Sequence, residues 1–369
     1  MPRKKKRIKR NSKGPANKRK SARIGLTKVL AVPIIFFAIV MAFGAFVTNR
    51  DNRSAKPLSM LTAAPPTPIP GNAPSREYVY AGAALISTVE PLREPPDDIA
   101  IWRPSNGQWW MLNGQGQASV YQWGVSSDIP TPGDFDGDGK TDFCVVRPVQ
   151  NGTSTWYIVL SSSGGNQYDY WGLSTDLPAV GDYDGDGKTD VSVWRPSSGV
   201  WSIHLSSNGS YSYPILGSNG DTPVPADFDG DGKTDPAVWH DSIATFSVLQ
   251  SSNGQTVSYS LGQSGDQPVI GDYDGDGKSD FATRRPSDGV WRIRYSSDGE
   301  IYSISWGLSS DIAVQGRYND LSDSDANTDI AVWRPSNGVW YIRRSSDGTM
   351  RAQAFGQQGD VPVPSNWRR

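Results

Sequence analysis

Four acidic segments decide the fold of this chain: GDFDGDGKTD at residues 133–142, GDYDGDGKTD at 181–190, ADFDGDGKTD at 226–235 and GDYDGDGKSD at 271–280. Their first residues lie 48, 45 and 45 positions apart, so they belong to an internal repeat. A run of strand-forming residues follows each copy. A repeat of about 45 residues that contains several short strands is typical of one blade of a β-propeller.

The repeat extends through most of the chain. Trp291 and Ile293 alternate with Arg292 and Arg294, which gives that segment one apolar face, as in a half-buried strand. Pro-Ser-x-Gly and Ser-Ser-x-Gly segments supply the Asn-Gly and Asp-Gly pairs that tight hairpins require. The units begin at Asp98, Asp142, Asp190, Asp235, Asp280 and Asp329. The sequence therefore predicts an all-β fold over residues 98–369, a six-bladed β-propeller.

The two ends of the repeat region complement each other. The chain enters at Asp98 with the strand that elsewhere follows an acidic loop, and no such loop precedes it. It leaves with DVPVPSNW at 360–367, which matches DTPVPADF at 221–228, the strand that elsewhere leads into a loop. We expect blade six to combine one strand from the C-terminus with three from the start, which leaves no free sheet edge. Residues 77–97 are expected to form a short β linker, with a seventh blade as the alternative.

The acidic loops have the composition of a metal site. Aspartates occupy loop positions 1, 3, 5 and 9, and position 7 offers a backbone carbonyl. Carboxylates that converge in a tight, Gly-rich loop repel one another without a cation, and hard oxygen ligands in a flexible loop suit Ca²⁺ better than Mg²⁺. A solvated acidic turn is the alternative. The predicted ligands are Asp134, Asp136, Asp138, Lys140 and Asp142; Asp182, Asp184, Asp186, Lys188 and Asp190; Asp227, Asp229, Asp231, Lys233 and Asp235; and Asp272, Asp274, Asp276, Lys278 and Asp280.

An EF-hand would share the first six loop positions, but it requires a Glu at position 12, where this chain has Val145, Val193, Val238 and Thr283. The loops instead resemble those of FG-GAP repeats, also called VCBS repeats, which occur in integrin α-subunit propellers and in many bacterial surface proteins. The resemblance implies about four structural Ca²⁺ ions, in loops that join the first two strands of successive blades. The loop at 316–329 has Arg317 at position 1 and four extra residues, so no metal is predicted there.

The N-terminal part predicts a membrane anchor. Residues 1–28 are rich in Lys and Arg, and all 38 acidic residues of the chain follow them. The segment VLAVPIIFFAIVMAFGAFV at 29–47 carries no charge and approaches the roughly 20 residues that a membrane-spanning helix needs. The positive-inside rule then assigns 1–28 to a cytoplasmic tail, 29–48 to an N-terminal transmembrane helix that acts as a signal anchor, and the body to the outside. The Pro-rich segment 49–76 is expected to be a stalk. A cleaved signal peptide is the alternative.

Other residues bear on function less directly. Cys144 is the only cysteine, so no intramolecular disulfide forms, and we expect it inside a strand. The recurring Trp residues are expected to pack between blades, and the recurring Arg-Pro arginines to fix turns or pair with acidic loops. His204 and His240 lie in no catalytic motif, so an enzyme is not predicted. Recognition is expected where blades differ: at 316–329, at 240–242 and near 151–155.

The sequence thus predicts a single-pass membrane protein, with its N-terminus in the cytoplasm and its propeller outside the cell. Adhesion or ligand recognition at the cell surface follows from the FG-GAP resemblance. The expected partners are the membrane, through one helix, and an extracellular protein or glycan; no nucleic acid is expected. A carbohydrate-binding lectin is the first alternative, and a polysaccharide hydrolase or lyase is the second.

Overall fold

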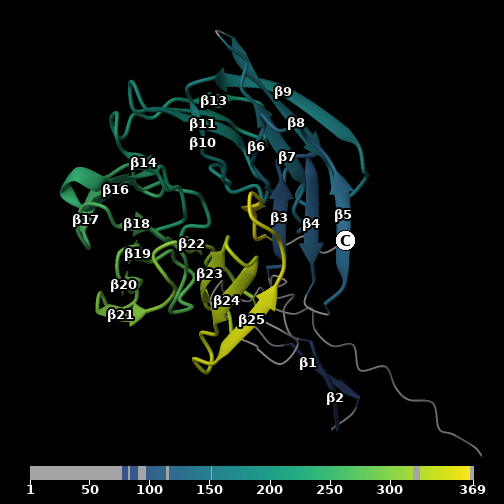
Figure 1. The fold of residues 1–369 in the computed structure, drawn as a ribbon, viewed down its shortest axis with the longest axis vertical. Helices are drawn as coiled ribbons and strands as arrows, with labels where there is room; N and C mark the ends of the chain where they lie inside the picture. The colour runs from purple at the N-terminus through teal and green to yellow at the C-terminus, as the bar shows by residue number, and fades with distance from the viewer. Residues whose placement is uncertain are drawn as a thin grey trace, which may run out of the picture. The chain divides into compact units, whose positions relative to one another are not determined.

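The computed structural model describes residues 77–81, 84–89, 97–113, 116–150, 152–318 and 325–365. These residues form 26 β-strands and one short 3₁₀-helix, η1 (Asp241–Ile243). Strands β1 (Glu77–Ala81) and β2 (Ala84–Val89) form a separate antiparallel hairpin, and all other strands belong to six four-stranded antiparallel sheets. Figure 1 shows these sheets following one another as the blades of a propeller. The predicted all-β, six-bladed architecture is therefore confirmed.

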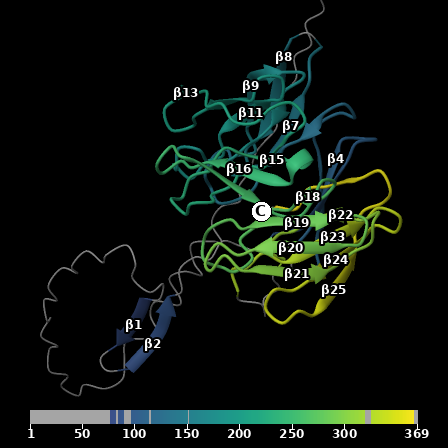
Figure 2. The same cartoon turned by 90° about the vertical axis from the view of Figure 1, so that its left-hand side faces the viewer.

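Five blades each use one continuous stretch of chain. Blade 1 contains β6 (Ile129–Pro130), β7 (Phe143–Arg147), β8 (Thr153–Val159) and β9 (Asn166–Leu173). Blade 2 contains β10 (Leu177–Pro178), β11 (Val191–Arg195), β12 (Val200–His204) and β13 (Tyr211–Ser212). Blade 3 contains β14 (Thr222–Pro223), β15 (Ala237–His240), β16 (Thr245–Leu249) and β17 (Thr256–Ser260). Blade 4 contains β18 (Gln267–Pro268), β19 (Phe281–Arg285), β20 (Val290–Arg294) and β21 (Ile301–Ser305). Blade 5 contains β22 (Ile312–Ala313), β23 (Ile330–Arg334), β24 (Val339–Arg343) and β25 (Met350–Ala354); Figure 2 shows blades 4 and 5.

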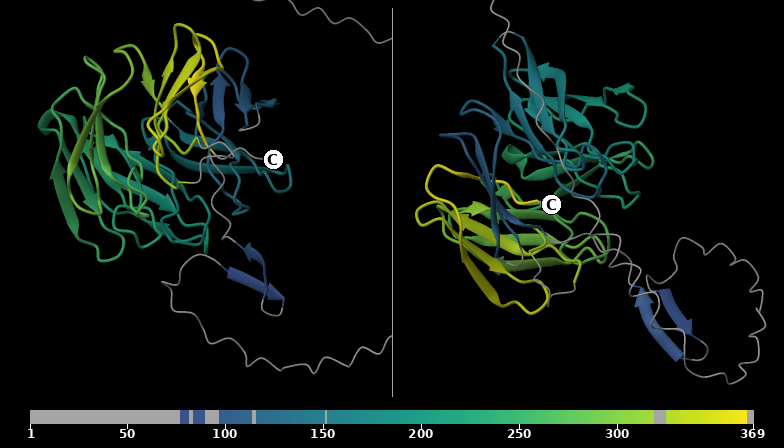
Figure 3. Two further views of the ribbon diagram at one scale, coloured as in Figure 1. Left: turned by 90° about the horizontal axis from the view of Figure 1, so that it is seen from below. Right: turned by 90° about the vertical axis from the view of Figure 1, so that its right-hand side faces the viewer.

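Blade 6 joins the two ends of the repeat region, as predicted. It consists of β26 (Val361–Pro362), β3 (Ile99–Arg103), β4 (Gln108–Leu112) and β5 (Ala118–Gln122). Val361 pairs with Trp102, and an isolated bridge joins Asp98 to Ser365. In Figure 3 the C-terminal strands lie beside the first strands of the propeller. Because β1 and β2 pair only with each other, the alternative of a seventh blade is wrong.

The first strand of each blade is two residues long, and in five blades its second residue is proline. This strand lies at the inner edge of its sheet, so one of its sides has no neighbouring strand. A proline lacks the N–H that a ladder bond on that side would use, and edge strands tolerate it for this reason. The repeated x-Pro dipeptide is therefore the sequence mark of the strand that lines the propeller axis.

Tryptophans fill the spaces within and between blades. Trp156 and Trp291 on the third strands are fully buried, and their indole N–H groups donate to the carbonyls of Trp171 and Trp306 at 3.0 Å. All nine tryptophans at these positions of the second and third strands are at most 2% exposed: Trp102, Trp109, Trp156, Trp194, Trp201, Trp239, Trp291, Trp333 and Trp340. The prediction that they are packing residues is confirmed. Cys144 is likewise buried inside β7.

The antiparallel order of the strands assigns every connection to one of two faces. The acidic loops join first to second strands and the Ser-Ser turns join third to fourth strands, so both lie on one face, here called the loop face. The Arg-Pro turns and the connections between blades lie on the opposite face, here called the turn face. Among the described residues, no helix is long and apolar enough to cross a membrane. The predicted tail, anchor and stalk (1–76) lie outside the described residues.

Candidate metal centres

Each acidic loop is closed at its base by the backbone. In the first loop Asp142 N–H donates to the carbonyl of Gly133 at 2.7 Å, which brings both ends of the loop together. Between them Gly137 and Gly139 have φ angles of +77° and +79°, in the left-handed region that favours glycine. The chain can therefore wrap tightly enough for alternate side chains to point inward. The same bridge closes the loops at 181–190, 226–235 and 271–280.

The wrapped loops bring aspartates together in groups of three, with one carboxylate oxygen from each within 4.8 Å of the others. The groups are Asp134, Asp136 and Asp142; Asp182, Asp184 and Asp190; Asp227, Asp229 and Asp231; and Asp272, Asp274 and Asp276. The remaining predicted aspartates, which lie outside these groups, are Asp138, Asp186, Asp235 and Asp280. Twelve of the sixteen predicted carboxylates thus converge.

Backbone N–H groups fix the first and the last carboxylate of each loop. Asp134 Oδ1 accepts from Gly137 N at 2.7 Å, and its Oδ2 accepts from Gly139 N at 2.8 Å. Asp142, which is fully buried, accepts from Phe135 N at 2.8 Å. The position-7 lysines Lys140, Lys188, Lys233 and Lys278 each donate a backbone N–H to the position-5 carboxylate at 2.9 Å. These hydrogen bonds orient the aspartate side chains without the help of a bound ion.

A second set of residues holds the middle carboxylates, and sequence reasoning missed it. Ser161 Oγ donates to Asp138 at 2.8 Å, and Ser162 Oγ donates to Asp136 at 2.6 Å. The equivalent serine pairs in blades 2 to 4 are Ser206 and Ser207, Ser251 and Ser252, and Ser296 and Ser297. In the sequence alone, Ser-Ser-x-Gly is fully explained as a tight turn. A signal was present: the pair occurs in every blade with an acidic loop, and blade 6 has Asn113 and Gly114 instead.

The loops carry negative charge that the protein does not neutralise. Burial raises the pKa of Asp142 and of Asp280 to about 6, which shows that the ionised forms are poorly solvated. Burial also raises the pKa values of Asp134, Asp190, Asp235 and Asp272. In addition, Asp184 Oδ1 and Asp229 Oδ1 are buried and accept no hydrogen bond. Converging, oxygen-only donors with uncompensated acceptors fit a hard cation such as Ca²⁺.

Adjacent loops are bonded to one another around the propeller. Thr189 N–H donates to the carbonyl of Asp134 at 2.6 Å, and Asp134 N–H donates to Thr189 Oγ1 at 2.9 Å. The next loops repeat the first bond, from Thr234 to Asp182, from Ser279 to Asp227 and from Thr328 to Asp272. Each ligand loop therefore rests on the loop that follows it.

The fifth loop keeps this framework without the full acidic pattern. The bridge between Gly316 and Asp329 is present, and Asp329 accepts from Tyr318 N at 3.0 Å. Arg317 occupies position 1, and its backbone N–H donates to Asp97 Oδ2 at 2.9 Å. Residues 319–324 lie outside the described residues, so the absence of a metal here stays a prediction.

On the turn face, the recurring arginines pair with aspartates that the sequence analysis did not single out. Arg195 donates to both carboxylate oxygens of Asp176, at 2.9 and 2.8 Å, and the Asp176 side chain is fully buried. The same pair forms between Arg103 and Asp360, Arg147 and Asp128, Arg285 and Asp266, and Arg334 and Asp311. These aspartates precede the first strand of each blade. The arginines thus fix the turns, as predicted, and their partners are not the acidic loops.

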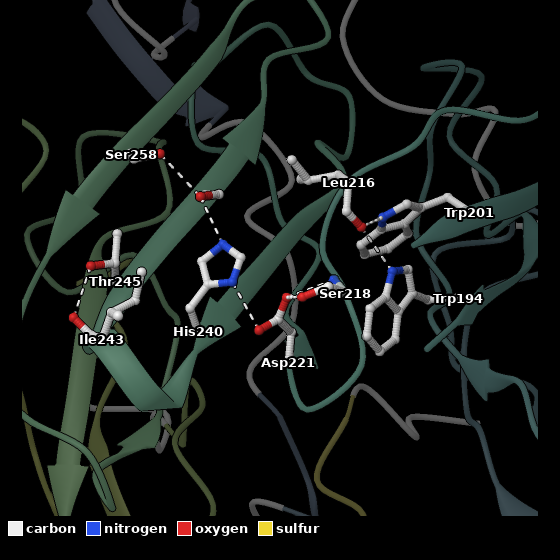
Figure 4. Close-up of polar contacts among 10 residues, drawn as sticks. Trp194, Trp201, Leu216, Ser218, Asp221, His240, Ile243, Thr245 and Ser258 are labelled. Atoms are coloured by element: carbon white, nitrogen blue, oxygen red, sulfur yellow. Dashed lines mark hydrogen bonds and ion pairs between the residues drawn. The ribbon is translucent and has the colours of Figure 1, made fainter. Parts of the chain in front are cut away.

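Blade 3 departs from this pattern. His240 replaces the arginine, and its Nδ1 lies 2.8 Å from Asp221 Oδ1 (Figure 4). His240 Nε2 lies 2.9 Å from Ser247 Oγ, which contacts Ser258 Oγ at 3.0 Å. The order Asp-His-Ser resembles a catalytic triad. However, Ser247 is buried in β16, a strand bonded on both sides, so the adjacent backbone N–H groups are committed to the sheet and offer no oxyanion hole.

Two stretches of the chain, residues 134–193 and 182–238, match a family model described as FG-GAP-like repeat. No sequence among curated proteins matches the chain. Among solved structures, TolB from Acinetobacter baumannii aligns with a TM-score of 0.51 and 14% identity, over 74% of this chain and 68% of that chain. An Agrocybe aegerita lectin that recognises non-reducing terminal N-acetylglucosamine aligns with a TM-score of 0.47 and 14% identity, over 71% of this chain and 76% of that chain. At this identity the similarity concerns the fold alone.

Proposed function

Because the chain is an FG-GAP repeat β-propeller, we propose that it is a calcium-stabilised recognition protein held at the outer surface of the cell membrane. The observation that carries the proposal is the convergence of three aspartates in each of four loops on one face. The carboxylates at positions 1, 3, 5 and 9 and the position-7 carbonyl would hold the ion. Bound Ca²⁺ would supply the positive charge that these buried groups lack.

In this proposal calcium replaces covalent cross-links. The chain has one cysteine, which is buried, and burial raises the pKa of its thiol, so it is inert as a disulfide partner. A ligand that binds only the folded state stabilises it by about 2.7 kcal/mol per site when its free concentration is 100 times its Kd. Four loops around a closed ring would therefore raise the free energy of unfolding substantially.

Calorimetric titration of the protein with Ca²⁺, with a thermal melt at each point, tests this role. We expect about four bound ions and a melting temperature that rises with calcium. A melt in EDTA that equals the melt in calcium would contradict the structural role. Mg²⁺ at the same concentration is the control, because it prefers a stricter octahedral site and should stabilise the protein less.

The membrane part of the proposal rests on the sequence of residues 1–48. An uncharged segment behind a basic block supports an anchor with the propeller outside. Extraction of membranes at alkaline pH should leave the protein in the membrane fraction, and protease added to intact cells should cleave it. A variant without residues 29–48 should be extracted. Recovery of the unaltered protein in the soluble fraction would instead favour a cleaved signal peptide.

Glycan recognition is a second candidate, and one observation favours it. The outer strand of blade 1 exposes Tyr168 and Tyr170, and the outer segment of blade 2 exposes Tyr211 and Tyr213, all between 53% and 69%. The places that match Tyr168 in blades 3 to 5 hold Ser258, Ser303 and Ala352, so packing does not require an aromatic residue there. Exposed rings offer flat apolar surfaces on which sugars stack.

A glycan array tests this candidate. The unaltered protein should bind one class of glycan, and a variant with Tyr168→Ser and Tyr211→Ser should lose that binding. A variant with Tyr302→Ser on blade 4 is the control for loss of exposed aromatic surface elsewhere. Absence of binding at high protein concentration would remove the lectin candidate. In either case we propose binding and not catalysis, because Ser247, the hydroxyl beside His240, is buried within a strand that is bonded on both sides.

A further inference from the structure

A pocket of about 230 Å³ lies between blades 3 and 4, close to the third acidic loop. Arg294 on β20 and Lys278 from the fourth loop both line it, and so do Gln250 and Tyr259. Two cationic side chains and an amide thus converge on one small cavity. The lining contains one carboxylate, that of Asp229.

The arginine is oriented but not neutralised. Its guanidinium lies over the ring of Tyr259 at 4.7 Å from the ring centre, and this contact orients the group. Among the described residues, no carboxylate lies within 4.0 Å of Arg294, and its guanidinium donates no hydrogen bond to the protein. By contrast, the five Arg-Pro arginines of the turn face are each held by a buried aspartate. A stacked guanidinium with free donors is the usual protein group for binding a planar oxyanion.

The same repeat positions provide an internal comparison. A matching pocket of about 240 Å³ lies between blades 1 and 2, where His204 stands in place of Arg294 and Asp169 in place of Tyr259. Asp169 Oδ2 lies 3.0 Å from His204 Nδ1, so an acidic group already occupies the position of an incoming anion. Between blades 4 and 5, Arg343 is kept, but Ile304 and Asn327 replace the tyrosine and the lysine. Among the described blade interfaces, arginine, tyrosine and lysine coincide only between blades 3 and 4.

We propose that the pocket between blades 3 and 4 binds a small oxyanion, a carboxylate or a sulfate, through Arg294 and Lys278. The inference deepens the proposed recognition function and rests on it for its biological meaning. One wall of the pocket contains Asp229, a predicted metal ligand whose charge opposes an anion. A cation in the third loop would offset that charge, so we expect the anion to bind more tightly in calcium than in EDTA.

Calorimetry on the full-length protein in detergent micelles tests the proposal with acetate, methyl sulfate, glucuronate and neutral glucose as probes. We expect the three anions to bind at one site and glucose not to bind. Tighter binding of glucuronate than of acetate would assign the carboxylate to a sugar acid, whereas equal binding would assign it to a free small anion. Equal binding of glucose and glucuronate would overturn the proposal, because recognition would then not depend on charge.

Variants connect the binding to the named residues. Arg294→Gln and Lys278→Gln should each weaken anion binding about 10-fold or more, since hydrogen bonds to charged groups are the stronger ones. Arg343→Gln, at the equivalent position of blade 5, is the matched control and should leave binding unchanged. The double variant Asp169→Tyr with His204→Arg should add a second site between blades 1 and 2. Unchanged anion binding in both Arg294→Gln and Lys278→Gln would overturn the proposal.

The experiments test the proposed metal sites and the proposed anion site independently. If Ca²⁺ binds but no anion does, the anion site is wrong and the metal sites stand. If the anions bind equally in calcium and in EDTA and Arg294→Gln abolishes binding, the anion site stands and the third loop holds no ion. The melting temperature of each variant shows whether it is folded.

Discussion

His240 Nδ1 lies 2.8 Å from Asp221 Oδ1, at the place where the five other blades hold an arginine bonded to an aspartate. His240 also contacts the neighbouring strand. Arg103, Arg147 and Arg334 stack on Trp110, Tyr157 and Tyr341, and the matching place in blade 3 is Ser247, which contacts His240. Blades 2 and 4 keep the arginine with Ser202 and Arg292 at that place, so the histidine of blade 3 is the change that sets it apart.

This relationship predicts unequal costs for removing the aspartates. Asp176→Asn should lower the free energy of unfolding by about 2 kcal/mol, because it leaves a partly buried arginine without its bidentate partner. Asp221→Asn should lower the free energy of unfolding by about half that amount, because an amide oxygen can still accept a hydrogen bond from the imidazole N–H of His240. Chemical denaturation of the two variants measures the difference. Equal costs would mean that His240 depends on the carboxylate charge as strongly as Arg195 does.

The loop-to-loop contacts predict a compensating pair of substitutions. A Cβ atom at Gly133 would lie 2.7 Å from Thr189 Cγ2, so Gly133→Ala should cost about 1–3 kcal/mol through overpacking. In the third loop the glycine is replaced by Ala226, and the residue that faces it is Ser279, which lacks the clashing methyl group. Gly133→Ala combined with Thr189→Ser should therefore recover most of the loss.

A double-mutant cycle measures this coupling. Thr189→Ser alone is the control, and it should cost little because Ser keeps the hydroxyl that accepts from Asp134 N–H. If the double variant were as unstable as Gly133→Ala alone, the methyl contact would not be the reason for the glycine.

The fold was largely predictable because the chain repeats itself. The match between residues 360–367 and 221–228 identified β26 as the missing first strand of blade 6, and the pairing of Val361 with Trp102 confirms it. In a repeat protein, one assigned unit supplies the strand order of all the others. The loop aspartates were equally visible, since their spacing alone places them on one side of a tight turn.

Contacts across the sheet were not predictable in the same way. The Ser162 hydroxyl reaches Asp136, 26 positions earlier, and Arg147 reaches Asp128 across the first two strands of its blade. Both contacts depend on which strand ends lie together on one face, and only the three-dimensional strand pairing shows that. In the sequence, a tight turn explains Ser-Ser and a turn-fixing role explains Arg-Pro. Neither motif therefore indicated that its side chains bind residues far away in the sequence.

The raised pKa values of Asp142 and Asp280 predict opposite pH dependence with and without calcium. Their folded-state pKa of about 6 lies above the ordinary value of 3.8, so without a metal the stabilising contribution of the protonated forms is complete below about pH 4. That contribution is lost as pH rises through 6. Ca²⁺ requires the ionised forms, so its stabilisation should grow over the same range.

Thermal melts in EDTA and in calcium between pH 4 and pH 8 check this prediction. The difference between the two melting temperatures should be small at pH 4 and should reach its maximum above pH 6. Comparison at each pH removes the contribution of other groups, such as Asp311, whose pKa is lowered by its bond to Arg334. A difference that does not change with pH would show that calcium does not bind these carboxylates.

The serine pairs predict a loss of calcium affinity without loss of a ligand. Ser161→Ala with Ser162→Ala should weaken calcium binding at the first loop about 10-fold, because hydrogen bonds that orient charged carboxylates are worth about 1.5–3 kcal/mol. The other three loops should be unaffected, so a calorimetric titration should separate one weak site from three unaltered ones. Ser126→Ala, at an exposed position on the turn face, is the control and should change nothing. If all four sites weakened together, the effect would instead pass through the loop-to-loop bonds such as that from Thr189 to Asp134.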